Sequence, residues 1–568
     1  MLSSKTKSNQ YWLSDFLCIA IFLGIFYSLW IGTNALFTPD EGRYSEVARE
    51  MVASGDYVTP RLDGVAFLDK PALYYWLQAS AIYLFGIKEW ALRFWPALIG
   101  VLGCLMSYIT GRTLFSRRAG ILSAIILATS PLYYGAAHYA NLDLEVAVLI
   151  GITLMFSLLG LRAEQNKRTL FFLAAYVFAG LAFLTKGLIG IAFPTLIIGF
   201  WILILNRWSI LKKMHLVIGL VIFVAITVPW YYLVQKANPE FLHFFFVTQQ
   251  FSRFLTTQDF NNKAAIWFYL PVVFAGFFPW SIFVLQAVAK SLKNIWENRQ
   301  AHANELFLLL WLFIIFTFFS LPKSKTVGYI IPIFPAIALL VGNYLDKLWN
   351  NAQSKGFFSC VSLFIFSSIT MFITCITLWY LKPSAELTLA APYLLITGIV
   401  FLIGGISAFV LLKKDNFAKL MYCLISVAAI SLLILSASAP VLNQKTLKPI
   451  AMQLKPLLKP SDEVVTYYKF YQDLPIYLER RITIVADWNA PDIAKNDNWL
   501  RELWYGMPFQ DTKDWLINEK LFWTRWHSNK KLVVFVDVNY LNNFIQQSDS
   551  TVHEISRYKD IVVVSNKA

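Results

Sequence analysis

The chain has 568 residues, of which 57% are hydrophobic and 15% charged, and its mean hydropathy is +0.55. This composition excludes an ordinary soluble protein, because it comes with repeated apolar runs long enough to cross a bilayer. The net charge of +15 does not point to nucleic acid, since the basic residues lie largely in short loops between apolar runs, where they orient a membrane protein.

The apolar runs predict an α-helical polytopic membrane protein with about thirteen transmembrane helices. The first run is too long for a cleaved signal peptide, so we expect it to remain as a helix. The five cysteines lie inside these runs, which excludes a disulfide framework or a CxxC metal site. The predicted spans are 13–33, 90–110, 119–137, 144–161, 170–184, 188–205, 216–233, 264–289, 306–321, 327–345, 357–381, 387–412 and 420–439.

The loops between these spans differ in charge. If the spans alternate in direction, the short loops rich in Lys and Arg all fall on one side. That side is the cytoplasm by the positive-inside rule. The N-terminus is then predicted inside, and the tail from Pro440 onward outside.

The first outer loop, 34–89, carries the most charge. Within it the apolar residues Tyr44, Val47, Ala48, Met51 and Val52 follow the spacing of one helix face. Two acidic residues, Asp40 and Glu41, come at its start, where the free N–H groups favour carboxylates. We expect a helix on the membrane surface that delivers Asp40, Glu41 and Arg43 to a site between transmembrane helices. An ordinary capped loop helix is the alternative.

Other loops on the same side also carry ionisable residues. Asp143 begins one span, Lys186 ends another, and Lys323 and Lys325 stand between two more; the loop 235–263 is longer. A single lysine there would be explained by snorkelling to the headgroups. Several such residues on one membrane face indicate a functional site.

The tail has a different composition. It is polar, and four β-rich runs (463–468, 481–485, 532–536 and 560–564) alternate with helix-like pieces. We therefore predict two domains, a transmembrane domain over 1–439 and a small α/β extracytoplasmic domain over 440–568. The tail shows no nucleophile elbow, P-loop or dinucleotide fingerprint, and its aromatic residues suit sugar binding and core packing equally well.

A charged site on the outer face, without a nucleotide-binding signature, favours a donor that arrives through the membrane as a lipid-linked phosphosugar. Cationic side chains would bind its phosphate and stabilise the charge left when the glycosidic bond breaks. A carboxylate would deprotonate the acceptor or stabilise the oxocarbenium-like centre. The phosphate-binding candidates are Lys70, Arg253, Lys186 and Arg43, and the carboxylate candidates are Asp40 and Asp143.

Six short motifs carry a family resemblance over nearly the whole chain. They resemble the GT-C membrane glycosyltransferases, in particular the bacterial aminoarabinose transferase (ArnT) branch, which is related to the protein O-mannosyltransferases. The motifs are PDEGRYSEVAREMV (Pro39–Val52), Asp69-Lys70-Pro71 with Tyr75-Trp76, Leu142-Asp143, Leu184-Thr185-Lys186-Gly187, Asn238-Pro239-Glu240-Phe241 leading to Arg253-Phe254, and Lys323-Ser324-Lys325 with Tyr329.

The resemblance implies a donor of undecaprenyl phosphate linked to a sugar, aminoarabinose-like or other, and lipid A as the acceptor at the periplasmic face of the bacterial inner membrane. Asp40 and Asp143 would be critical carboxylates, and Lys70 and Arg253 would contact the lipid phosphate. The full predicted site has catalytic Asp40, Asp143 and Glu41, phosphate-binding Lys70, Arg253, Arg43 and Lys186, and substrate-binding Tyr44, Asp69, Tyr75, Lys323, Lys325 and Tyr329.

Two departures from the family pattern affect these expectations. Asp69 stands where relatives usually have Glu, and Thr248-Gln249-Gln250 replaces a His/Glu-rich pattern that supplies metal ligands in relatives. We therefore assign no cofactor from the sequence, and we expect the zinc site of relatives to be missing or weaker here. A protein O-glycosyltransferase stays open as an alternative. A transporter is disfavoured because we find neither repeated halves nor broken helices.

Overall fold

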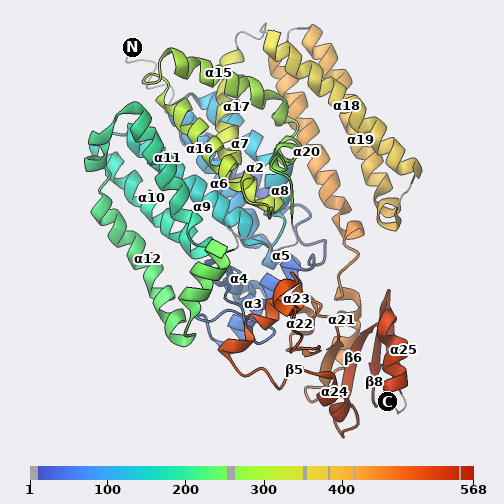
Figure 1. The fold of residues 1–568 in the computed structure, drawn as a ribbon. Coiled ribbons are helices and arrows are strands. Elements are labelled where there is room, and N and C mark those ends of the chain that lie inside the picture. Colours follow the sequence, from blue (N-terminus) through green and yellow to red (C-terminus); the bar gives the residue numbers. More distant parts are fainter. Residues whose placement is uncertain are drawn as a thin grey trace. The chain divides into compact units, whose positions relative to one another are not determined.

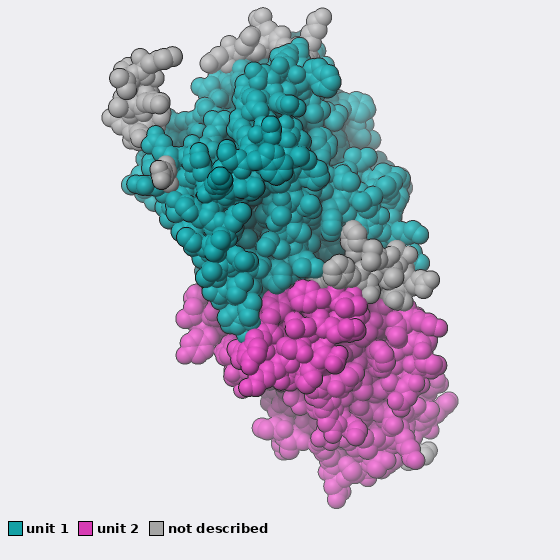
Figure 2. All heavy atoms as spheres, turned by 60° about the vertical axis from the view of Figure 1, so that its left-hand side comes forward, with its two compact units in different colours: residues 1–34, 93–229, 262–444 teal, residues 35–92, 230–261, 445–568 magenta. Residues whose placement is uncertain are grey.

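The computed structural model describes residues 11–252, 263–349, 355–381, 384–414, 416–548 and 552–567. Most of them are helical, and a small sheet lies near the C-terminus (Figure 1). The chain divides into two compact units, coloured in Figure 2. Unit 1 contains residues 1–34, 93–229 and 262–444, and unit 2 contains residues 35–92, 230–261 and 445–568.

Long apolar helices make up most of unit 1. Among the described residues, 9 helical segments are long and apolar enough to cross a membrane. These segments are α6 (Phe94–Leu114), α9 (Leu142–Arg162), α10 (Gln165–Lys186), α12 (Leu216–Ala237), α16 (Ala303–Ser320), η4 with α17 (Val327–Ile333 and Phe334–Leu348), α18 (Lys355–Leu381), α19 (Ala385–Lys413) and α20 (Phe417–Leu442).

Two pairs of apolar helices are bent at a short break, as in a broken span or a re-entrant loop. The helices α7 (Arg117–Ala128) and α8 (Pro131–Ala137) meet at 66°. The second pair, α14 (Tyr269–Gly276) and η3–α15 (Trp280–Phe283 and Val284–Glu297), meets at 113°. Each second member begins at or just after a proline, which has no N–H to continue the preceding helix. The prediction of unbroken helices is therefore wrong at these two places, and it no longer argues against a transporter.

Two shorter apolar helices, α2 (Trp12–Ser28) and α11 (Ile189–Leu205), complete the set. The class predicted from the sequence, an α-helical polytopic membrane protein, is confirmed. Every predicted span overlaps one of these segments, but the described residues hold 9 spans by length and composition, or up to 11 with the bent pairs. The number thirteen stays a prediction. Short connecting helices are η1 (Trp208–Lys213) and the π-helix η2 (His243–Ser252).

Unit 2 combines pieces that are far apart in the sequence. Its first piece contains α3 (Asp40–Ser54), the hairpin β1–β2 (Arg61–Leu62 and Val65–Ala66), α4 (Leu73–Phe85) and α5 (Glu89–Leu92). Its last piece contains α21 (Lys448–Leu454), η5 (Lys455–Leu457), α22 (Leu474–Leu478), η6 (Ile493–Lys495), α23 (Trp499–Trp504), η7 (Met507–Phe509), α24 (Glu519–Trp526), α25 (Val538–Gln547) and six strands.

The six strands form one mixed sheet in the order β5-β4-β3-β6-β8-β7. The first four in that order are parallel, and β8 runs antiparallel to β6 and β7. Phe522 of α24 and Phe544 of α25 pack with the strand residues of the core. The strands are β3 (Glu463–Tyr467), β4 (Thr483–Val485), β5 (Leu516–Ile517), β6 (Leu532–Asp537), β7 (His553–Tyr558) and β8 (Ile561–Ser565).

The predicted α/β tail is thus present, with β5 and β7 in addition to the four expected strands. The chain enters the last part of unit 2 after Gln444, close to the predicted boundary at 439/440. However, 35–92 and 230–261 also belong to unit 2, whereas hydropathy had grouped them with the transmembrane part. Whether 1–439 and 440–568 are separate domains stays a prediction.

Candidate active site

Helix α3 forms where the apolar spacing predicts it. Val47, Ala48 and Met51 are at most 1% exposed, and Gly55 ends the helix with a left-handed φ of 71°. The acidic side of the helix is buried as well, with Glu46 at 0% exposure. The helix therefore does not have one solvated face, because it packs inside unit 2 on both sides.

Arg43 lies at the centre of a charged group that we call the arginine cluster: Asp40, Arg43, Asp69 and Glu502. Its Nη2 donates to Asp40 Oδ1 at 2.9 Å, and its Nη1 donates to Glu502 Oε1. Glu502 lies on α23, so the first loop and the C-terminal part both contribute to the cluster. The Asp40 side chain is 36% exposed, whereas that of Glu502 is 11% exposed. Asp40 is thus more accessible to a substrate than Glu502 is.

The electrostatics of the cluster follow from burial and charge balance. Burial raises the pKa of Glu502 to about 7, against the lowering effect of Arg43, and Asp69 and Asp40 raise it further. Burial works against the charge of Arg43, but Glu502, Tyr44 and Asp40 together raise its pKa. Arg43 therefore stays a cation, and Glu502 is a carboxyl that titrates near neutral pH.

Lys70 and Tyr75 follow Asp69 in the chain. Lys70 donates from Nζ to the carbonyl oxygen of Asp69 at 3.1 Å. Tyr75 is fully buried, its ring lies 6.1 Å from that of Tyr44, and its hydroxyl has no hydrogen-bond partner in the described part of the chain. Burial, and then the charge of Asp69, raise the pKa of Tyr75. The structure thus places Tyr44, Asp69 and Tyr75 near Arg43, and their role in substrate binding stays a prediction.

Glu41 differs from its neighbours. It is 0% exposed, and its Oε2 accepts a hydrogen bond from the backbone N–H of Phe37 at 2.7 Å. This contact closes the turn that leads into α3. The predicted catalytic role of Glu41 stays a prediction, and its visible contact is structural.

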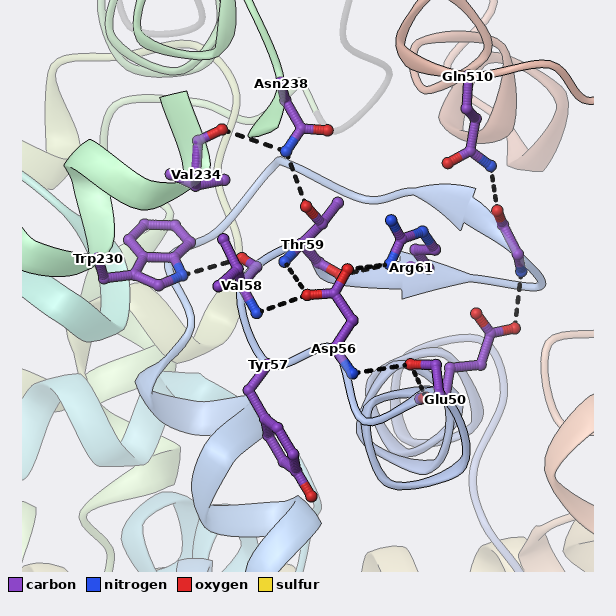
Figure 3. Close-up of polar contacts among 12 residues, drawn as sticks. Glu50, Asp56, Tyr57, Val58, Thr59, Arg61, Trp230, Val234, Asn238 and Gln510 are labelled. Atoms are coloured by element: carbon purple, nitrogen blue, oxygen red, sulfur yellow. Dashed lines mark hydrogen bonds and ion pairs between the residues drawn. The ribbon is translucent and has the colours of Figure 1, made fainter. Parts of the chain in front are cut away.

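The turn after α3 is anchored to the end of α12 (Figure 3). Asp56 Oδ1 accepts from the N–H groups of Val58 and Thr59, at 2.9 and 3.2 Å. Trp230 donates from Nε1 to the Val58 carbonyl at 3.0 Å, and Asn238 donates from Nδ2 to Thr59 Oγ1 at 2.8 Å. The Asn238 motif, noticed for its family resemblance, therefore holds the first loop in place.

A second anchor joins the β1–β2 turn to the C-terminal part. Asp63 and Gly64 have φ of 51° and 77°, as a two-residue hairpin turn requires. Asp63 Oδ1 accepts from the N–H of Ile482 at 2.8 Å, and Glu50 Oε1 accepts from the N–H of Gly64 at 2.7 Å. Burial raises the pKa of both Asp63 and Glu50. Gln510 donates to the Gly64 carbonyl, as Figure 3 shows.

Unit 1 holds a second charged group, the lysine cluster: Asp143, Lys186 and Tyr329. Lys186, at the end of α10, donates from Nζ to Asp143 Oδ1 at the start of α9. The same Nζ lies 4.1 Å from the centre of the Tyr329 ring, close enough for a cation–π contact. A Cβ at Gly328 would lie 2.4 Å from Asp143 Oδ2, so this carboxylate needs glycine there. Three predicted residues from three separate motifs therefore meet.

The two lysines of the Lys323–Lys325 motif have different surroundings. Lys323 is exposed, and its carbonyl accepts from the N–H of Ala264 at 2.9 Å. Lys325 is 5% exposed and donates from Nζ to the carbonyls of Ala264, at 3.2 Å, and Pro322. Burial lowers the pKa of Lys325. Its visible role is to fasten this loop, and substrate binding by both lysines stays a prediction.

Arg253 lies outside the described residues. Within them, no group of three or more His, Cys, Asp or Glu side chains is placed to hold a metal ion. Gln249 is 8% exposed and is not a usual zinc ligand. The residues present therefore do not assemble a metal site in the described part of the chain, and metal dependence stays a matter for proposal.

Glu502 was not found by sequence reasoning. It follows Trp499 in a tail whose aromatic residues were noted, but no motif marks it. A carboxylate in a polar α/β segment is common, and nothing local indicates a partner 459 positions away. The one available signal was indirect: Arg43 needs acidic partners, and a search of the tail for such partners could have suggested Glu502.

The protein is thus a polytopic helical protein with carboxylate-paired cations at the ends of its helices. Residues 69–233 match the family model described as dolichyl-phosphate-mannose-protein mannosyltransferase. The chain is 29% identical over 341 residues to the undecaprenyl phosphate-alpha-4-amino-4-deoxy-L-arabinose arabinosyl transferase of Edwardsiella ictaluri, covering 59% of this chain and 60% of that one. The corresponding protein of Erwinia tasmaniensis is 31% identical over 58% of this chain and 59% of its own length.

The aligned part of this chain therefore covers about 60% of the full length of these curated relatives. In structure the similarity is wider. ArnT from Cupriavidus metallidurans, solved bound to undecaprenyl phosphate, matches with a TM-score of 0.83 and 27% identity over 99% of both chains. The resemblance to the aminoarabinose transferase branch, predicted from the motifs, is confirmed, and so is the GT-C-like fold.

Proposed function

We propose that this protein is an integral membrane glycosyltransferase that moves a sugar from an undecaprenyl-phosphate-linked donor to lipid A. The observation that carries the proposal is the match over 99% of both chains to a transferase solved with undecaprenyl phosphate. The named activity of the curated relatives agrees with it. The sugar is aminoarabinose or a close analogue.

Each of the two clusters, taken by itself, offers groups that such a transfer needs. The donor leaves as a lipid phosphate, so cations must bind the phosphate and stabilise its growing charge. Lys186 is a cation paired with Asp143. Arg43 is a cation paired with Asp40 and Glu502. Paired cations keep their positions before the substrate arrives, and a phosphate oxygen can replace a carboxylate as the acceptor. Lys70 and Arg253 are further phosphate ligands in this proposal.

Asp40 and Asp143 are the carboxylates of the proposed site, and Asp40 would act on the sugar side. A carboxylate can stabilise the positive charge that develops at the anomeric carbon, or take a proton from an acceptor hydroxyl. The exposure of the Asp40 side chain, 36%, supports contact with a substrate. The Asp143 side chain, at 14%, is better suited to positioning Lys186.

We further propose that the protein lies in the bacterial inner membrane, with its N-terminus in the cytoplasm and residues 440–568 in the periplasm. The one-sided distribution of basic loops supports this orientation. Reporter fusions test it: a fusion at Ala568 should report from the periplasm and one in the Lys413–Lys419 loop from the cytoplasm. An intracellular signal at Ala568 contradicts the orientation.

Metal independence, or a metal site weaker than in relatives, is part of the proposal because Thr248 and Gln250 are poor zinc ligands. Metal analysis of the purified protein, with activity before and after chelation, tests it. Stoichiometric zinc that leaves together with activity contradicts it.

A protein acceptor is the second candidate, favoured by the description of the matching family model. Both candidates are tested with purified protein, undecaprenyl phosphate carrying aminoarabinose, and either lipid A or a protein acceptor. We expect a lipid A product by mass spectrometry, and none from the matched Lys186→Ala variant. Transfer to protein alone would replace the proposal by the second candidate.

A further inference from the structure

The helical bundle of unit 1 contains a cavity. Its volume is about 390 Å³, and it is lined by residues of α9, α10, α11, η1 and α12; Figure 1 shows α9, α10, α11 and α12 as neighbouring helices. This is more than twice the ~150 Å³ of an engineered apolar cavity that binds benzene. The lining includes Phe172, Tyr176, Met214 and Phe223.

The walls of the cavity are apolar in effect. The hydroxyls of Thr153, Ser157 and Tyr176 donate to the backbone carbonyls of Leu149, Thr153 and Met214, at 2.8, 2.7 and 3.0 Å. These groups therefore offer little to a water molecule or a polar ligand, whereas an apolar cavity of this size suits a hydrocarbon.

The cavity opens sideways between α11 and α12. Thr195 and Gly199 of α11 are exposed, as are Leu216 and Leu220 of α12, and all four line the cavity. A Cβ at Gly199 would meet nothing within 4 Å. Because this is a multi-pass membrane protein, a lateral opening between two apolar helices faces lipid chains.

The rim of the cavity is basic. Lys212 and Lys213 are exposed and stand in the chain between two lining residues, Leu211 and Met214. Neither lysine forms an ion pair within the described part of the chain. Arg207 donates from Nη2 to Oε1 of Gln300 at 2.9 Å. This amide is neutral, so the contact leaves the positive charge of Arg207 in place. An apolar slot beside uncompensated cations matches an anionic lipid.

The end of the cavity beside η1 lies away from the lysine cluster, whereas Ile191, at its other end, follows Lys186 by only five residues. Along α9, Thr153 and Ser157 follow Asp143 by about 10 and 14 residues, and along α10, Tyr176 and Phe172 precede Lys186 by similar steps. At 1.5 Å per residue, that is roughly 15–21 Å, half or more of the ~30 Å hydrocarbon thickness.

We propose that this cavity binds one acyl chain of an anionic phospholipid, whose phosphate rests on Lys212 and Lys213. The ligand is a membrane phospholipid and not the sugar donor. Two lysines near an anionic headgroup contribute about 2 kcal/mol, which corresponds to about 30-fold in affinity. The proposal does not depend on the proposed transferase activity.

Native mass spectrometry of the purified full-length protein tests it with phosphatidylglycerol, phosphatidylcholine of the same acyl chains, and undecaprenyl phosphate. We expect retained phosphatidylglycerol, with much less phosphatidylcholine. Gly199→Leu, which fills the mouth without a Cβ clash, should abolish retention, and Lys212→Ala with Lys213→Ala should weaken it about 30-fold.

The matched controls are Gly24→Leu, another helical glycine with open space at its Cβ, and Lys290→Ala with Lys293→Ala, on another basic segment. Both should retain phosphatidylglycerol like the natural protein. Equal retention of both phospholipids, unchanged retention in Gly199→Leu, or a loss in Gly199→Leu of undecaprenyl phosphate alone would each overturn the proposal. Melting temperatures of all variants show whether they are folded.

Discussion

Arg43 in the first turn of α3 pairs with Glu502 on α23, although 459 positions separate them in the chain. The pair joins the motif of the first loop to the C-terminal part inside unit 2. It also makes Glu502 a neighbour of Asp40 and Asp69, whose charges act on its pKa. The activity of the protein should therefore depend on a residue that no sequence motif marks.

The first prediction concerns this pair. Glu502→Ala should lower kcat/KM by about 10- to 150-fold, because a charged hydrogen bond contributes about 1.5–3 kcal/mol. Since the pKa of Glu502 is about 7, protonation weakens the pair as pH falls through 7, and the rate should fall with it. Glu502→Gln should lack this pH limb. The control is Glu554→Gln, because Glu554 forms an exposed pair with Arg557. If Glu502→Gln has the same pH profile as the natural protein, protonation of Glu502 does not set the pH limb.

The second prediction concerns Lys186 and Asp143. Lys186→Ala should lose activity by at least about tenfold while the protein still inserts, since the cation and its charged hydrogen bond are both removed. Asp143→Asn should lose less if its role is to position Lys186. Transfer rates of the single and double variants give the coupling between them. Purely additive losses would mean that the observed contact does not matter for transfer.

The third prediction uses Asp40 to identify the acceptor group. A lipid A phosphate already carries negative charge near neutral pH, because its second pKa is about 6, and it needs no general base. Asp40→Asn should then lose activity because Arg43 loses the charged partner that positions it. High pH should not restore this activity. The measurement is the pH–rate profile of Asp40→Asn with native acceptor lipids. A rate that climbs steeply above about pH 8.5 would indicate a hydroxyl acceptor instead.

The fourth prediction concerns packing at Gly42. A Cβ there would lie 2.8 Å from the backbone of Gln472 and Asp473, and backbone cannot move aside as a flexible side chain can. Gly42→Ala should therefore cost about 1–3 kcal/mol of stability and lower the melting temperature. Gly135→Ala, with nothing within 4 Å of its Cβ, is the matched control. Equal melting temperatures in both variants would rule out the tight approach.

The fifth prediction concerns the pH dependence of stability. Asp473 is fully buried, and burial raises its pKa to about 6 although the Thr446 hydroxyl and the Leu447 N–H donate to it. Between about pH 4 and 6 the unfolded chain releases this proton and the folded chain keeps it, so stability should fall as pH rises. Asp473→Asn can keep both bonds and should flatten this slope in melting curves from pH 4.5 to 7. The control Asp492→Asn should keep the slope of the natural protein. If Asp473→Asn also keeps that slope, the pH dependence of stability comes from other groups.

The local elements of this protein could be predicted from the sequence. Long apolar runs must become helices in a bilayer, because the backbone groups have no other partners there, and so the helices of unit 1 appear where hydropathy predicts them. The spacing of Val47, Ala48 and Met51 marked α3 for the same local reason. The motifs around Asp143, Lys186 and Tyr329 identified the lysine cluster through family resemblance.

Tertiary structure decided which groups meet. The Arg43–Glu502 pair, the turn of Lys325 onto backbone carbonyls and the burial of Glu46 and Glu50 depend on chain segments that are distant in sequence. Hydrophobic periodicity describes one element at a time and cannot identify the partner of a buried charge. A buried ionisable side chain is tolerated when the fold brings it a counter-charge or a hydrogen bond, and that condition is met in space and not along the chain.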